Sequence, residues 1–146
     1  MDKFDERILQ ALKLDGRIAN VDLAEKIGLS PSATLRRVQE LEKRGVITGY
    51  KAKLDPNEMG IGFIAYVSIG LSNHSKQAQL AFEEHVSFVD EVVECHSITG
   101  ATEYLLRVET QDLISYKKFH ADVLGECEFV NSIATMVVMA SPKDLR

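Results

Sequence analysis

The chain has 146 residues, of which 45% are hydrophobic and 27% are charged, and its formal net charge is −5. This composition is typical of a folded globular protein and excludes disorder and collagen-like sequence. No apolar run approaches the roughly 20 residues that cross a bilayer, and residues 1–6 lack the apolar segment of a signal peptide. Cys95 and Cys127 have no C-x-x-C spacing, so we expect reduced thiols in a cytoplasmic protein with no membrane partner.

The charge is unevenly distributed along the chain. Residues 1–54 carry 11 basic and 8 acidic residues, a net +3, whereas residues 55–146 carry 6 basic and 14 acidic residues, a net −8. Within residues 30–53, two acids stand against six basic residues, which are Arg36, Arg37, Lys43, Arg44, Lys51 and Lys53. The acidic average therefore conceals a local basic surface that a polyanion such as DNA could meet.

The first fifty residues have the apolar spacing of three helices. The first carries Phe4 and Ile8 on one face and ends near Gly16, and the second begins at Asn20 as N-cap and ends at Gly28. The third starts with Ser30 as N-cap and Pro31 in its first turn, stops at Gly45, and has a predicted buried ridge of Leu35, Val38 and Leu41. Two short helices joined by a glycine-containing turn predict a helix-turn-helix. Residues 46–54 alternate apolar with basic or polar side chains, which predicts a wing or a connecting strand.

The rest of the chain alternates between strand and helix patterns. Strands are predicted at 63–71, 90–99, 103–109 and 128–140, and helices at 76–87 and 112–124, the second with Leu113, Tyr116, Phe119 and Val123 facing inward. The order β-α-β-β-α-β predicts a ferredoxin-like antiparallel sheet with both helices on one face, so the fold class is α+β. Apolar residues on both strand faces predict that a second copy of the chain covers the open face.

Two strings resemble the Lrp/AsnC (feast/famine) family of transcription regulators: "LDGRIANVDLAEKIGLSPSATLRRVQELEKRGVITGYKAKLDP" and "ECHSITGATEYLLRVETQDLISYKKF". The resemblance covers nearly the whole chain and implies a winged helix-turn-helix DNA-binding domain at 1–50, a connecting strand at 51–60 and a βαββαβ sensing and oligomerisation (RAM) domain at 61–146. It further implies dimers that build octamers or hexadecamers, and a small amino acid bound between dimers.

DNA contacts are predicted on the third helix and the segment after it. Arginine can donate two hydrogen bonds to guanine and glutamine can pair with adenine in the major groove, while hydroxyls and free N–H groups at the helix start suit a phosphate. Two lysines at alternate positions of a strand would both point toward the DNA backbone. The alternative is an ordinary solvated helix face. The candidate residues are Ser30, Pro31, Ser32, Thr34, Arg36, Arg37, Gln39, Lys51 and Lys53.

The family resemblance places the effector site in a Gly-x-x-Asp turn, where this chain has Glu103 at the Asp position. Glycine permits close approach of a ligand, backbone N–H groups can hold a carboxylate, and an acidic side chain can hold an ammonium group. The alternative is a glycine turn with a solvated glutamate. The candidate residues are Thr99, Gly100, Ala101, Thr102 and Glu103, with Thr135, Met136 and Val137 of the last strand contributed by a neighbouring subunit.

Three other functions compete with an effector-controlled regulator. An enzyme is disfavoured because Cys95 and His96 are adjacent on a strand and point to opposite faces. A metal sensor could draw on Cys95, Cys127 and the four histidines, His74, His85, His96 and His120, but their spacing matches no compact zinc motif. An architectural DNA-binding protein without an effector would differ only at residues 99–103. We expect no cofactor and no bound metal.

Overall fold

The computed structural model describes residues 1–146 and separates into two compact units, Met1–Lys53 and Leu54–Arg146. The boundary between the units falls inside the segment 51–60, which the sequence analysis assigns to the connection.

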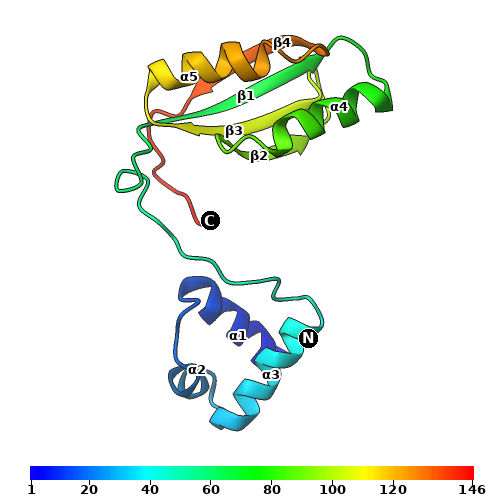
Figure 1. The fold of residues 1–146 in the computed structure, drawn as a ribbon. Coiled ribbons are helices and arrows are strands. Elements are labelled where there is room, and N and C mark those ends of the chain that lie inside the picture. Colours follow the sequence, from blue (N-terminus) through cyan, green and yellow to red (C-terminus); the bar gives the residue numbers. More distant parts are fainter. The chain divides into compact units, whose positions relative to one another are not determined.

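The first unit consists of three helices, α1 (Lys3–Leu14), α2 (Asn20–Ile27) and α3 (Pro31–Lys43) (Figure 1). Their shared core contains Ile8, Leu23, Ile27 and Leu41, all nearly inaccessible to solvent. Glycines with left-handed backbone follow α2 and α3, with φ 79° at Gly28 and 76° at Gly45, so both predicted helix ends are confirmed.

Both predicted end residues in the α1–α2 connection are wrong. The C-cap of α1 is Asp15 instead of Gly16, and the N-cap of α2 is Ala19, which leaves Asn20 inside the first turn. The Asn20 side chain has a different partner, because its Nδ2 donates to the carbonyl oxygen of Pro31 at 2.8 Å. This bond ties the start of α2 to the start of α3, which is the turn of the helix-turn-helix.

The predicted strand at residues 46–54 is also wrong, because the chain there forms no strand. A single strand satisfies its backbone N–H and C=O groups only by pairing with another strand, and the first unit contains none. Val46, Tyr50 and Leu54 are exposed.

The second unit has the predicted βαββαβ order. Its elements are β1 (Phe63–Leu71), α4 (Lys76–Ser87), β2 (Val92–Ser97), β3 (Tyr104–Thr110), α5 (Leu113–Phe119), a π-helical turn at His120–Leu124, and β4 (Val130–Val137). The strands form one antiparallel sheet in the order β2-β3-β1-β4 (Figure 1). The helix predicted at 112–124 changes to π geometry at His120, whose carbonyl accepts from the Gly125 N–H five residues on.

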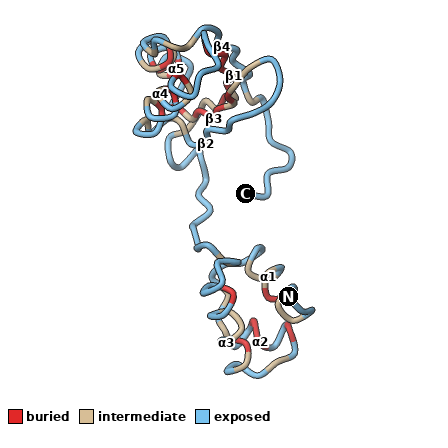
Figure 2. The backbone as a smooth tube through the Cα atoms, turned by 90° about the vertical axis from the view of Figure 1, so that its right-hand side faces the viewer, coloured by how far each residue is buried: buried red, intermediate tan, exposed pale blue.

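One face of the sheet packs against both helices. Ala65, Val67 and Ile69 of β1 are fully buried beneath Phe82 of α4 and Phe119 of α5. The buried stretches of β1 and β3 appear in red in Figure 2. Leu113 was predicted to face this core but is mostly exposed, because it lies at the first position of α5, beyond the edge of the packed layer.

The opposite sheet face carries a polar network at its centre. The Arg107 side chain, only 6% exposed, donates to Tyr66 Oη at 3.0 Å and to Glu109 Oε2 at 3.2 Å. Glu94 lies 3.8 Å from Arg107 and also accepts from Arg146 at 2.7 Å. Met136 remains 49% exposed on the same face, because it lies opposite Tyr66 in the β1–β4 register. No helix of the second unit covers this face.

Candidate DNA and effector sites

The start of α3 is a capped helix end with few free backbone donors. Ser30 Oγ accepts from the Ala33 N–H at 3.2 Å, and the Thr34 N–H bonds to the Ser30 carbonyl at 3.0 Å. Pro31 has no N–H, so the Ser32 N–H is the free backbone donor of the first turn. Ser32 Oγ lies 3.3 Å from Ser30 Oγ. A phosphate at this end would be held by two hydroxyls and one N–H.

The solvent face of α3 presents four exposed side chains at the spacing i, i+3, i+4, i+7, which are Ser32, Leu35, Arg36 and Gln39. Arg36 forms no ion pair within the chain. The prediction that Leu35 is buried is wrong, since it is 46% exposed. The buried residues of α3 are instead Thr34 and Leu41, so Thr34 takes the core position that was predicted for Leu35.

Thr34 does not belong to the outer face on which the sequence analysis placed it. It is fully buried, and its Oγ1 donates to the Ser30 carbonyl at 2.9 Å. A hydroxyl that bonds back to the preceding turn satisfies itself inside the helix, which lets threonine occupy a core position. Thr34 therefore supports the recognition helix from within.

Arg37 is held by α1. Its guanidinium donates to Asp2 at 2.7 Å and to Asp5 at 3.1 Å, and it lies over the Phe4 ring, 5.2 Å from the ring centroid. The pKa of Asp2 lies below its ordinary value because the Asp5 N–H, which this N-cap accepts, and Arg37 both stabilise the carboxylate. These contacts, all made by Nη1, position α3 against α1 and engage part of the guanidinium that was predicted to contact DNA.

Lys51 and Lys53 are exposed, but no strand places them on one side of the chain. Their predicted common direction depended on the strand at 46–54, which the structure lacks. They are two exposed cations in a segment without helix or strand, and lysine ammonium groups of this kind neutralise phosphates without fixed geometry.

The turn between β2 and β3, where the effector site is predicted, contains a tight glycine bend. Gly100 has φ 128°, which favours glycine, and the Ile98 N–H donates to the Glu103 carbonyl at 3.0 Å across the base of the turn. Thr102 Oγ1 lies 2.6 Å from Ser68 Oγ of β1. Thr99, Gly100 and Ala101 at the tip are exposed.

Glu103 is engaged within the chain on both carboxylate oxygens. Its side chain is 16% exposed, Oε2 accepts from the Leu71 N–H at 2.8 Å, and Oε1 lies 2.8 Å from His74 Nδ1. The alternative of a solvated glutamate is therefore wrong. His74 was missed as a site residue because it is distant in sequence and lies in the β1–α4 loop, where no spacing rule connects it to the turn.

The strip of β4 assigned to the effector divides between the two sheet faces. Thr135 lies opposite Val67, and its hydroxyl hydrogen-bonds Tyr116 of α5 on the helix side. Val137 lies opposite Ala65 and shares that side, whereas Met136 lies opposite Tyr66 on the open face. Since strand side chains alternate, a ligand bound on one face of the sheet would meet Thr135 and Val137, or Met136, but not all three side chains.

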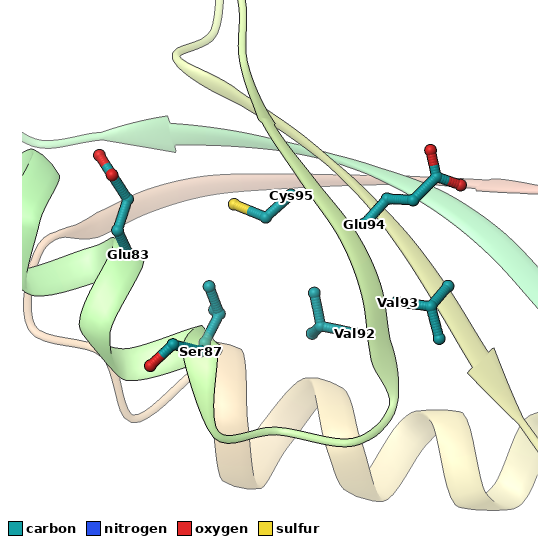
Figure 3. A pocket seen from close by; sticks show the side chains of 7 residues that line it. Glu83, Ser87, Val92, Val93, Glu94 and Cys95 are labelled. Atoms are coloured by element: carbon teal, nitrogen blue, oxygen red, sulfur yellow. The ribbon is translucent and has the colours of Figure 1, made fainter. Parts of the chain in front are cut away.

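A shallow pocket of about 270 Å³ lies between α4 and the edge strand β2, lined by Glu83, Val86, Ser87, Val92, Val93, Glu94 and Cys95 (Figure 3). Cys95 points toward Glu83 in this view, whereas Glu94 points away. Burial, and to a lesser extent Glu83, raises the pKa of the Cys95 thiol, which disfavours the reactive thiolate. His96 contacts Glu94 at 2.9 Å, away from Cys95.

No three His, Cys, Asp or Glu side chains gather closely enough to hold a metal ion. None of the helices combines the length and apolar character that crossing a membrane requires.

Comparison with known proteins gives matches over both units. The sequence profile described as winged helix-turn-helix DNA-binding matches residues 1–48, and the profile of the Lrp/AsnC ligand binding domain matches residues 64–146. The leucine-responsive regulatory protein of Escherichia coli strain K12 is 36% identical over 143 residues, which cover 98% of this chain and 87% of that protein.

Two solved structures share the fold along the whole chain. The L-Met complex of a transcriptional regulator from Neisseria meningitidis superposes with a TM-score of 0.95 at 34% identity, covering 99% of this chain and 93% of that one. A feast or famine regulatory protein from Mycobacterium tuberculosis, complexed with L-methionine, has a TM-score of 0.87 at 26% identity and coverages of 98% and 95%.

Proposed function

Because the chain belongs to the Lrp/AsnC family of DNA-binding transcription regulators, with a helix-turn-helix and an amino-acid binding domain, we propose that it is a sequence-specific regulator whose assembly or DNA affinity is set by a small amino acid. Its relatives are transcription regulators, and the chain is not an enzyme. In this proposal it acts in the cytoplasm and needs no cofactor.

The exposed, internally unpaired face of α3 is the observation that carries the proposal for DNA. Arg36 supplies a two-pronged donor for guanine O6 and N7, and Gln39 supplies a donor and an acceptor for adenine. Ser30, Pro31 and Ser32 set the helix end against a phosphate, and Lys51 and Lys53 add attraction that depends on salt. Thr34 and Arg37 hold the helix in position and do not touch the bases.

The effector half of the proposal rests on Glu103 and the Gly100 turn. The carboxylate of Glu103 would take the α-ammonium of an amino acid, and exposed N–H groups of residues 99–102 would take its carboxylate. Because Glu103 already contacts His74, the incoming ammonium displaces the imidazole. The L-Met complexes of two structural neighbours support an amino acid as the class of ligand.

In the same proposal the open sheet face joins two copies into a dimer, and dimers build an octamer or a similar ring. Met136 and the Tyr66–Arg107 network would lie in a self-complementary interface, since a two-fold axis presents the same patch on both subunits. An effector that prefers one assembly changes the spacing of the recognition helices, and a coupling of about 1–3 kcal/mol makes a useful switch.

One observation favours a second candidate, an architectural DNA-binding protein without an effector. Both Glu103 oxygens are satisfied within the chain, so the site is complete without a ligand. Several recognition helices on one assembly would then raise avidity by geometry alone.

A single titration tests both candidates. A duplex selected by the protein from a random-sequence pool, labelled for fluorescence anisotropy, is titrated beside a scrambled duplex and with each common amino acid. Specific binding that one amino acid shifts supports the regulator. Specific binding that none shifts supports the architectural protein, and binding without preference over the scrambled duplex contradicts both.

A further inference from the structure

We infer that Leu35 is a specificity-determining residue that reads the methyl group of a thymine in the major groove. This inference rests on the proposed DNA-binding function of α3 and adds an apolar element to its polar readout. It assigns a role to a side chain that sequence periodicity placed in the core.

The position of Leu35 on α3 is the first observation. The helix buries Leu41 fully and Val38 partly against the three-helix core, yet 46% of Leu35 stays accessible. An exposed leucine forgoes part of its burial free energy in a small domain that has little apolar area to spare. Burial of Leu35 against the bound partner would explain why a leucine stays exposed on this binding face.

The neighbours of Leu35 define what that partner is. Ser32 lies one turn earlier on the same face, Arg36 is adjacent and Gln39 lies one turn later, so the leucine is enclosed by groups that donate to base edges. An unpaired arginine beside it disfavours a purely apolar protein partner. In the major groove the C5-methyl of thymine is the apolar group that the base pairs present.

The chemistry therefore predicts a particular order of bases. Arg36 would bond a guanine, and Leu35, one residue away along the helix, would contact the methyl group of a thymine in a neighbouring base pair. The methyl group contributes to specificity only when Leu35 is present, so the two are energetically coupled.

The test replaces thymine by deoxyuridine, which lacks only the C5-methyl, at each thymine of a duplex selected from a random pool by the full-length protein. In the parent protein, the replacement at one position per half-site should weaken binding about fourfold. This factor corresponds to about 0.8 kcal/mol for one buried carbon. In Leu35→Ala, which should fold normally, the same replacement should have no effect. Leu14→Ala removes another exposed leucine, at the end of α1, and should keep the sensitivity of the parent.

Two further controls keep the test decisive. Leu35→Met retains an apolar contact and should keep the sensitivity, which covers the case in which the alanine variant is unstable by circular dichroism. Sensitivity that persists in a folded Leu35→Ala protein, or a selected duplex with no sensitive thymine, overturns the role of Leu35 while leaving DNA binding intact. A parent protein that does not prefer the selected duplex to a scrambled one overturns the proposed function itself.

Discussion

Glu103 and His74 join the turn between β2 and β3 to the loop that follows β1, with Oε1 of the carboxylate 2.8 Å from Nδ1 of the imidazole. The other oxygen, Oε2, accepts from the Leu71 N–H at 2.8 Å. The hydrogen bond from Leu71 is therefore part of the fold, whereas the exposed His74 side chain is a partner that a ligand can replace.

Glu103→Gln separates these two roles. Glutamine still offers an oxygen to the Leu71 N–H but carries no charge for an ammonium group, so we expect the melting temperature to hold within a few degrees while the amino-acid response of DNA binding is lost. Glu103→Ala should be less stable by about 1–3 kcal/mol, because it leaves the Leu71 N–H without a partner. Anisotropy titrations and thermal melts measure both effects. A normal amino-acid response in Glu103→Gln would mean that the effector binds elsewhere.

His74→Ala should bind the effector more tightly than the parent. The imidazole occupies Glu103 Oε1, and an ammonium group must displace it. L-methionine is the probe, measured by calorimetry on the intact protein, and His96→Ala is the matched control because that histidine pairs with Glu94 on the open sheet face. Equal affinities in His74→Ala and the parent would show that His74 does not compete.

Replacing the neighbouring arginines of α3 should affect different properties, DNA binding for Arg36 and stability for Arg37. Arg36→Ala removes an exposed base-reading group, so specific binding should weaken by about 10- to 100-fold, equivalent to about 1–3 kcal/mol, with no change in melting temperature. Arg37→Ala removes the bonds to Asp2 and Asp5, so the three-helix unit should melt earlier. Footprinting at a protein concentration that just saturates the parent separates the two, since Arg37→Ala should still protect the site below its melting temperature and Arg36→Ala should not. The assignment fails if the two variants exchange these phenotypes.

Local sequence rules predicted the elements of this fold because each rests on short-range chemistry. Ser30 and Pro31 start α3, Gly28 and Gly45 end helices, and alternation identified β1 and β3. The errors arise where tertiary packing decides. The apolar spacing of α3 fits more than one buried face, and only contact with α1 and α2 selects Thr34 over Leu35.

The site residues divide in the same way. Gly100 and Glu103 were predicted as effector-site residues from the family resemblance of one short turn. His74 and the Arg37–Asp2 pair could not be predicted, because they join segments 29 and 35 positions apart, and no periodicity connects such distances.

Acid should destabilise the first unit through Asp2. The pKa of this N-cap is depressed below its ordinary value of 3.8 by the Asp5 N–H and by Arg37. A group whose pKa is lower in the folded state contributes stability that is fully present above its unfolded pKa and is lost as the pH falls through the folded value. Asp2→Asn keeps a capping oxygen without the charge, so its helical signal should depend less on pH below about 4 than that of the parent. Asp22→Asn, on the exposed first turn of α2, is the control and should follow the parent; identical acid profiles for Asp2→Asn and the parent would contradict the role of the charge.

Met136→Lys should dissociate the proposed dimer. Met136 lies on the open sheet face opposite Tyr66, which separates it from Arg107 on β3. A lysine there would lose apolar contact across a two-fold interface and would meet its own copy's charge across that axis. Sedimentation velocity should give a smaller species than the parent, with an unchanged circular dichroism spectrum. Leu80→Lys places the same charge on the exposed side of α4 and should keep the parent assembly. If the two lysine variants sediment alike, the copies meet through another surface and the open face has some other partner.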